Sequence, residues 1–196
     1  VVLFPVNGDG SLQPATSVIR HEGSGPNPRR QKQAYAHSIR FSEKSDLIWA
    51  ADLGADKLFA YRMDATAKNL VPAVPPFVSL PPGSGPRHFV WSPDGKWVYV
   101  ANELISSVTL FENSPSGMRE IETVSTLPSG YTGVSYCADI HLSPDGRMLY
   151  VSNRGDNSIA VFHRGTDGRL SLLKVVPTEG DWPRNFTIDP SGQFML

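Results

Sequence analysis

Residues 85–104, GPRHFVWSPDGKWVYVANEL, carry ionisable side chains at both ends of a stretch that is otherwise patterned as strand, turn and strand. Arg87 and His88 stand near its start, and Glu103 stands near its end. A carboxylate or an imidazole can move protons when its pKa lies near the working pH, and a guanidinium binds carboxylate or phosphate through parallel hydrogen bonds. These residue types together suit acid–base chemistry on an anionic substrate.

The same strand, turn and strand recur along the chain, so that each position can be compared with its equivalents. The copies open at His37, Arg87, Ala138 and Arg184, at offsets of 50, 51 and 46 residues. A residue kept in every copy serves the geometry of the repeating unit, because each unit solves the same folding problem. The opening position changes between copies, so its charged members are candidates for function.

A second variable position follows the second strand of each copy. The residues there are Leu53, Glu103 and Arg154. In an antiparallel hairpin closed by a tight turn, the start of the first strand and the end of the second lie together at the open end. We therefore expect Arg87 and Glu103 at one rim. The residues expected to converge on this rim from neighbouring units are His37, Arg154 and Arg184.

Rim charges also have a plainer interpretation, since most surface charges form exposed salt bridges that contribute little to stability. Here the arginines at positions 87, 154 and 184 outnumber Glu103, at a place where a low dielectric makes unpaired charge costly. An anionic ligand would balance them. The repeat pattern alone leaves both interpretations open.

The position after the opening residue is polar in every copy. Its residues are Ser38, His88, Asp139 and Asn185. Hydrogen bonding around a central channel explains this pattern, and a functional role is the alternative. We therefore retain His88 and Asp139, with Arg184, as candidates for substrate binding.

Two other residues with reactive side chains are expected to be structural. Cys137 precedes the opening position of the third copy, and a nucleophilic thiol needs a base and a lowered pKa, so that a buried small hydrophobe is the favoured interpretation. His141 aligns with Val90, and we expect it to be a hydrogen-bonded residue of the core.

A third aligned position holds Asp52, Asn102 and Asn153. Asx side chains suit the turn into the third strand, because they bind backbone N–H groups there. A calcium site needs oxygens that converge on one point rather than one oxygen donor from each unit. We therefore expect turn residues with no metal and no cofactor, and keep a calcium-dependent enzyme as an alternative.

The elements that position these residues are short strands. Glycine and proline, 17 of each, recur in SPDG-like clusters between runs rich in Val, Tyr, Phe and Trp, without a helical stripe. A period near fifty residues is typical of propeller blades. We predict an all-β fold, a partial β-propeller over residues 1–196. Its parts are a blade remnant at 1–30, blades that begin near residues 36, 86 and 137, and a truncated blade at 182–196.

An arc of about four blades leaves sheet faces and strand edges exposed, whereas propellers normally close their ring. We therefore expect this chain to be a piece of a larger propeller, and by itself to self-associate through its open edges.

The overall charge narrows the possible partners. Lys plus Arg number 18 and Asp plus Glu 19, which gives a net charge of −1. No basic field exists to hold nucleic acid or an anionic membrane, and no apolar run approaches the roughly 20 residues that span a bilayer. The single cysteine fits a reducing compartment, so a soluble cytoplasmic protein is expected.

The segments HEGSGPNPRRQKQAYAHS, GPRHFVWSPDGKWVYVANEL, ADIHLSPDGRMLYVSNRG and DWPRNFTIDPSGQFML resemble the seven-bladed propeller lactonase family. That family includes 6-phosphogluconolactonases and fungal 3-carboxy-cis,cis-muconate lactonizing enzymes. The resemblance covers essentially the whole chain and implies a seven-bladed parent. It also implies active-site roles for His37, Arg87, Glu103 and Arg154. Tyr35 stands where family members often have a histidine.

The resemblance implies a metal-independent hydrolase of a sugar-acid lactone. Glu103 or His37 would act as general base or acid, and Arg87 and Arg154 would hold the substrate carboxylate or phosphate and stabilise the oxyanion. The alternatives are a muconate-type cycloisomerase, which needs the same residue types, and a non-catalytic propeller scaffold.

Overall fold

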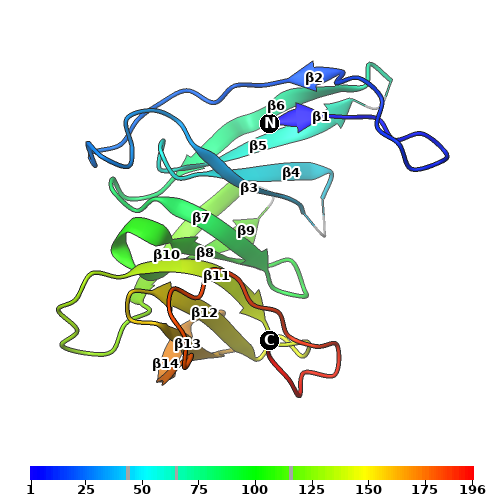
Figure 1. Cartoon of the computed structure of the whole chain (residues 1–196). Coiled ribbons are helices and arrows are strands. Elements are labelled where there is room, and N and C mark those ends of the chain that lie inside the picture. Colours follow the sequence, from blue (N-terminus) through cyan, green and yellow to red (C-terminus); the bar gives the residue numbers. More distant parts are fainter. Residues whose placement is uncertain (43–44, 65, 115–116) are drawn as a thin grey trace.

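The computed structural model describes residues 1–42, 45–64, 66–114 and 117–196. Three antiparallel four-stranded sheets form its body, each meandering in chain order from an inner to an outer strand (Figure 1). The first comprises β3 (Ala36–Phe41), β4 (Leu47–Asp52), β5 (Lys57–Asp64) and β6 (Asn69–Ser79). The second comprises β7 (Pro86–Trp91), β8 (Trp97–Asn102), β9 (Ser107–Ser114) and β10 (Gly117–Ser125). The third comprises β11 (Tyr136–Leu142), β12 (Met148–Arg154), β13 (Ser158–Arg164) and β14 (Leu170–Pro177).

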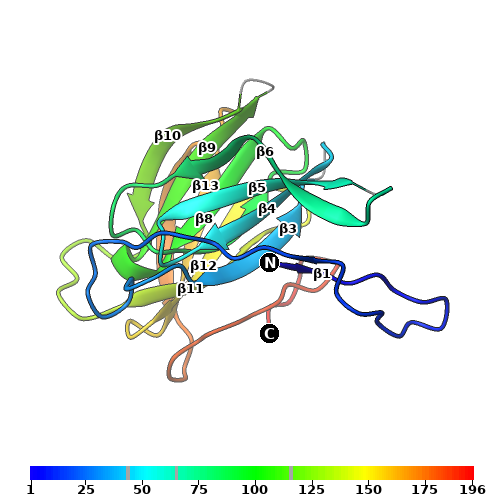
Figure 2. The ribbon, with the colours of Figure 1, turned by 90° about the horizontal axis from the view of Figure 1, so that it is seen from above.

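Shorter elements complete the chain. Near the N-terminus, β1 (Val2–Leu3) pairs with β2 (Ser17–Val18). A single 3₁₀ turn, η1 (Glu103–Ile105), links β8 to β9. Residues 178–196 run back beside the third sheet (Figure 2), where Asn185 and Phe186 contact Asp139 of β11, and an isolated bridge pairs Ile188 with Met195.

Register fixes which residues share the open end of each hairpin. Pro86 pairs with Asn102, and the equivalent pairs in the other sheets are Ala36 with Asp52 and Cys137 with Asn153. Each first strand carries a bulge directly after this pair. A bulge re-aims the neighbouring side chains, so the opening residue of each copy lies next to the end of the second strand.

The hydrophobic core lies between the sheets. One cluster joins the second and third sheets through Tyr99, Leu110 and Phe162, and another joins the first and second through Trp49, Phe89 and Phe111. Adjacent sheets bury the faces that they turn towards each other, because a single four-stranded sheet cannot cover its own apolar face. This packing sets the sheets as a fan, with β3, β7 and β11 side by side (Figures 1 and 2).

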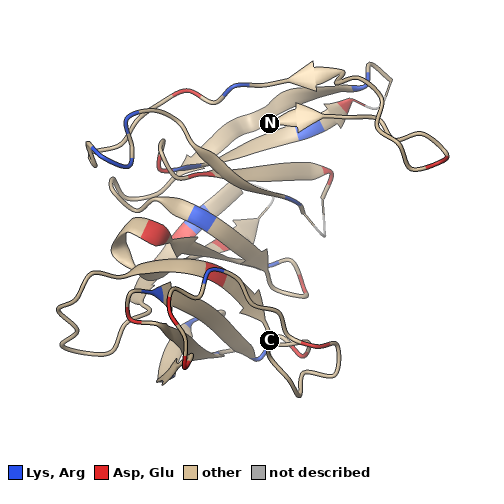
Figure 3. Ribbon diagram, in the orientation of Figure 1, with Lys and Arg blue, Asp and Glu red and all other residues tan. Residues whose placement is uncertain are grey.

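The prediction of an all-β, partial β-propeller fold is confirmed: the described residues form strands, turns and one short 3₁₀ element. The fourth strand of each sheet was not predicted from the sequence. These strands, β6, β10 and β14, are largely exposed and their buried positions do not alternate regularly, so they carry no clear strand pattern. Charges of both signs are dispersed over loops and strand ends (Figure 3). The described part of the chain contains no helix that is long and apolar enough to cross a membrane.

Candidate active site

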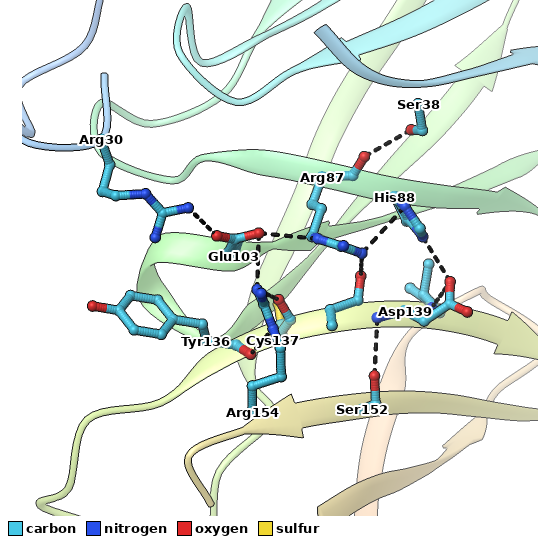
Figure 4. Close-up of polar contacts among 12 residues, drawn as sticks. Arg30, Ser38, Arg87, His88, Glu103, Tyr136, Cys137, Asp139, Ser152 and Arg154 are labelled. Atoms are coloured by element: carbon cyan, nitrogen blue, oxygen red, sulfur yellow. Dashed lines mark hydrogen bonds and ion pairs between the residues drawn. The ribbon is translucent and has the colours of Figure 1, made fainter. Parts of the chain in front are cut away.

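One buried carboxylate, Glu103, is surrounded by three guanidinium groups (Figure 4). Arg30 donates a short hydrogen bond to its Oε1. Oε2 lies 3.0 Å from Nε of Arg87 and 2.9 Å from Nη2 of Arg154, as ion pairs. Glu103, Arg87 and Arg154 are 2%, 3% and 6% exposed. We call Arg30, Arg87 and Arg154, with Glu103 between them, the arginine cluster.

Backbone contacts at the open end of the second hairpin place Glu103. Its N–H donates to the carbonyl of Gly85 at 2.8 Å, and the next N–H, of Leu104, donates to the carbonyl of Ser84 at 3.1 Å. Gly85 has a φ of +65°, and a Cβ there would lie 2.4 Å from Leu104. Glycine is therefore required for the chain to bring η1 against the start of β7.

Arginine side chains of two sheets are fixed by carbonyls of β11. Arg87 donates through Nη1 to the carbonyl of Ala138 at 2.7 Å, and Arg154 donates through Nη2 to the carbonyl of Cys137 at 3.1 Å. Because β7, β11 and β12 all contribute, the cluster forms only when adjacent sheets pack. Each guanidinium keeps further N–H groups that could bind an anion.

The arginine cluster keeps Glu103 ionised. Burial alone would raise the pKa of this carboxyl, but the hydrogen bond from Arg30 and the charges of Arg154 and Arg30 outweigh burial and lower the pKa below its ordinary value. Burial also lowers the pKa of Arg87, while the charge of Glu103 opposes that change. With one carboxylate and three guanidinium groups, the cluster carries an excess of positive charge.

His37 on β3 lies beside the cluster rather than within it. Its ring meets that of His88 edge-on, with centroids 5.2 Å apart. Burial, followed by the charges of Arg87 and His88, lowers the pKa of His37 to about 4, so the imidazole is neutral at pH 7. Its Nδ1 is buried and has no hydrogen-bond partner among the described residues. The ring also lines a cavity of about 210 Å³ next to Val1 and Val2.

His88 connects Arg87 to Asp139. Its Nε2 lies 3.2 Å from Nη1 of Arg87, and its Nδ1 lies 2.7 Å from Oδ1 of Asp139. An arginine can only donate, so Nε2 accepts from Arg87 and Nδ1–H donates to the carboxylate. His88 is therefore a second support for Arg87.

Asp139 is saturated by protein groups. It accepts from His88, from His141 at 3.0 Å, from Asn185 at 2.6 Å, and from the N–H groups of Ile140 and Phe186. Burial would raise the pKa of Asp139, but the hydrogen bonds from His141 and His88 lower it far below its usual range. The side chain is 2% exposed, which favours a positioning role over direct contact with substrate.

Arg184 is exposed and makes no hydrogen bond or ion pair with any residue that the structure describes. Its charge contributes to the lowered pKa of Arg87, which places the two guanidinium groups within electrostatic range of each other. The structure thus brings Arg87, Glu103 and Arg154 into contact, sets His37 and His88 beside them, and leaves Arg184 unpaired.

The aligned residues Asp52, Asn102 and Asn153 bind protein groups of their own sheet and of the chain segments that precede it. Asp52 accepts the N–H groups of Tyr35 and Ala55 and contacts Nδ1 of His21 at 2.7 Å. Asn102 donates to Ser107 and Thr109, and Asn153 donates to Thr126 and Ser158. Among the described residues, no three of the His, Cys, Asp and Glu side chains are grouped to hold a metal ion.

The two reactive side chains expected to be structural have different environments. Cys137 is fully buried in the core between the second and third sheets, and burial raises its pKa to about 12, so its thiol is protonated and inert. His141 is half-buried rather than a core residue, and its ring packs edge-on against Phe186. The expected hydrogen bonding is present, to Asp139 at 3.0 Å, but the expected burial in the core is wrong.

Arg30 is the member of the cluster that sequence comparison missed. It lies in the segment before β3, outside the repeated hairpins, so that no equivalent position marks it. Its guanidinium also lies 5.5 Å from the centre of the Tyr136 ring. The doublet Arg29–Arg30 within HEGSGPNPRRQKQ was the available signal, but nothing in the sequence shows which arginine turns inward.

Comparison with known proteins identifies the fold's relatives. The family model for lactonases with a seven-bladed β-propeller matches residues 1–196. A 6-phosphogluconolactonase of Bacillus subtilis is 40% identical over the whole chain and one of Formosa agariphila is 37% identical over 98% of it. The chain spans 56% of the length of both relatives.

Solved structures agree with this assignment. The periplasmic gluconolactonase PpgL of Pseudomonas aeruginosa superposes with a TM-score of 0.93 and 39% identity, covering 99% of this chain and 55% of that one. A protein from Lactobacillus plantarum superposes with a TM-score of 0.92 and 35% identity, covering 99% and 56%. The chain belongs to the seven-bladed β-propeller lactonase family.

Proposed function

We propose that the protein containing these residues hydrolyses a sugar-acid lactone and binds the anionic group of its substrate at the arginine cluster. The observation that carries this proposal is the convergence of three guanidinium groups on one buried carboxylate, that of Glu103. The relatives named 6-phosphogluconolactonase support the substrate class.

In this proposal, His37 is the general base. Its neutral imidazole takes a proton from water as the water oxygen bonds to the lactone carbonyl carbon. The carbonyl oxygen becomes an oxyanion, which the guanidinium groups of Arg87 and Arg154 stabilise. Collapse of the intermediate breaks the bond from carbon to the ring oxygen, and the imidazolium returns the proton to that oxygen. One water is consumed, and the product is an open-chain hydroxy acid.

Glu103 has a different role from the base considered from the sequence. Both of its carboxylate oxygens are already paired with guanidinium groups, whereas Nδ1 of His37 has no hydrogen-bond partner among the described residues. The contacts of Glu103 with Arg30, Arg87 and Arg154 instead fix the directions in which these guanidinium groups point. His88 and Asp139 support Arg87 from the opposite side, and Arg184 is available for the substrate's anionic group.

The assay that tests this function uses the full-length protein with 6-phosphogluconolactone and 3-carboxymuconate, each with and without EDTA. We expect lactone hydrolysis that EDTA does not reduce, because charge stabilisation is assigned to arginines. Turnover of only the muconate would indicate the cycloisomerase, loss of activity in EDTA the calcium-dependent enzyme, and turnover of neither substrate the scaffold.

The Glu103→Gln substitution tests whether activity depends on the charge at the centre of the arginine cluster. Because it leaves three guanidinium groups around an uncharged amide, we expect kcat/KM to fall by about 100-fold or more. Glu112→Gln is the matched control, since Glu112 pairs with Arg119 at the surface, and it should keep normal kinetics. Normal turnover by the Glu103 variant would contradict the assignment.

We also propose a cytosolic location, on the single unpaired cysteine, although the Pseudomonas relative is named as periplasmic. Cell fractionation with an antibody to the protein decides between these compartments, and recovery from the periplasm would overturn the proposal.

A further inference from the structure

Trp182 occupies a repeat position that glycine fills in the second blade. It stands two residues before Arg184, as Gly85 stands two residues before Arg87. The backbone conformations agree, with a φ of +61° at Trp182 and +65° at Gly85. Glycine adopts this left-handed region freely, whereas a bulky side chain is strained there. The chain therefore carries a large ring at a position whose geometry suits glycine.

Neighbouring side chains hold Trp182 in this conformation. Its N–H donates to Oδ1 of Asn157 at 3.0 Å, and Nδ2 of Asn157 donates to Asp181 at 2.7 Å. Non-glycine residues with strained backbones persist where the surroundings impose the conformation, and they gather at functional sites. The contacts made by the ring show which function it can serve.

The ring of Trp182 lies at the edge of the arginine cluster. The guanidinium carbon of Arg154 is 5.9 Å from its centre, and the ring of Tyr136, 6.4 Å away, meets it edge-on. Tyr136 occupies the equivalent position in the third blade, and Arg30 lies over its ring. Trp182 is 49% exposed, so that a ligand bound to the arginines can reach its face.

We propose that Trp182, supported by the edge-on ring of Tyr136, forms a platform for the six-membered ring of an anionic sugar, while the arginine cluster binds its phosphate or carboxylate. The C–H groups of a sugar ring carry partial positive charge and suit the negative face of an indole. This inference rests on the proposed function and names the substrate class of the same site. In this inference, Trp182 recognises the sugar ring of the substrate, and the arginines recognise its phosphate or carboxylate.

Tryptophan fluorescence tests the platform without any catalysis. Within residues 1–196 the other tryptophans, Trp49, Trp91 and Trp97, are buried at 4%, 5% and 5% exposure. The difference signal between the full-length protein and its Trp182→Phe variant therefore reports on Trp182. The probes are glucose 6-phosphate, which has a ring and an anion but no lactone, and inorganic phosphate, which has no ring. We expect the difference signal to change with glucose 6-phosphate only.

The Trp182→Gly variant distinguishes a platform from a structural role. It removes the ring and also the backbone strain, so we expect a melting temperature no lower than that of the parent. Affinity for glucose 6-phosphate should fall about five- to tenfold, with phosphate affinity unchanged within about twofold. Trp182→Phe, which keeps an aromatic ring, should retain most of the affinity. Glu179→Gly is the control, because Glu179 is exposed and also has a positive φ, of +55°.

Three results would overturn the platform: equal affinity of the Trp182→Gly variant for glucose 6-phosphate, an equal loss for phosphate, or no Trp182-dependent signal. Failure of the proposed function looks different. If the parent binds glucose 6-phosphate through Trp182 but hydrolyses no lactone, the platform stands and the hydrolase is wrong. If it hydrolyses lactone and the Trp182→Gly variant has an unchanged KM, the hydrolase stands and the platform is wrong.

Discussion

At the scale of single residues, the surroundings of Glu103 and His37 give the two side chains different roles, although the residue types alone would allow either to act as an acid or a base. Glu103 and His37 are both able to move protons in principle. The three guanidinium groups hold Glu103 as a carboxylate, while burial and the charge of Arg87 hold His37 as a neutral imidazole. The site therefore has a base in its unprotonated form next to a preorganised positive field, which is the pairing that attack by water on an ester requires.

The titration of His37 gives a testable pH dependence. Its pKa falls from 6.5 to about 4 on folding, so the acid limb of kcat/KM should have its midpoint near pH 4. The same shift means that His37 contributes stability fully above pH 6.5, and that this contribution is lost as the pH falls from 6.5 towards 4. The ring proton of His37 should titrate by NMR with the same midpoint, and the His37→Asn variant identifies the signal. A midpoint at or above 6.5 would contradict the neutral base.

At the scale of the elements, the end of each second strand performs two tasks. The Asx residue satisfies local polar groups, and the next residue projects towards the neighbouring blades. In the first blade, Asp52 binds the N–H groups of Tyr35 and Ala55 and holds His21, whose ring stacks on Phe59 at 4.0 Å. This arrangement fastens the segment before β3 to the sheet, and the same segment carries Arg30.

Replacement of Asp52 should therefore destabilise the fold. Asp52→Ala removes three buried contacts, and we expect the free energy of unfolding to fall by about 2–4 kcal/mol. Asp46→Ala is the control, because Asp46 is 69% exposed and its ion pair with Arg62 should contribute under about 1 kcal/mol. Denaturant unfolding measures both. A melting temperature that rises with calcium in the parent, but not in the Asp52 variant, would instead support a metal role.

At the scale of the whole molecule, the third sheet keeps an apolar face that the described residues cover incompletely. A cavity of about 670 Å³ lies there, away from the arginine cluster, and its lining includes Tyr150, Val161, Leu173 and Phe186. In a propeller, the next blade packs on such a face. Because each sheet in the fan is covered by the next one, the outer face of the third sheet needs a further sheet or another chain to cover it.

Residues 1–196 expressed by themselves should therefore associate and bind a hydrophobic dye such as ANS. Sedimentation over a wide range of concentrations should show species larger than the monomer. Leu173→Glu places a charge on the exposed apolar face, where Leu173 is 57% exposed, and should shift the distribution towards monomer. We expect little lactonase activity from the monomer, because the arginines would lack a closed channel. A stable, dye-free monomer with full activity would contradict this expectation.

The amino-acid sequence by itself determined the repeating unit and its strands, because period-two burial and SPDG turns act over a few residues. It also determined that Arg87 and Glu103 share the open end of one hairpin, since pairing register follows from a tight turn. Tertiary structure alone decided that Arg30 joins them, that Asp139 is saturated, and that Trp182 lies beside Arg154. Those contacts form between blades, where packing of distant segments sets the distances and no local pattern specifies them.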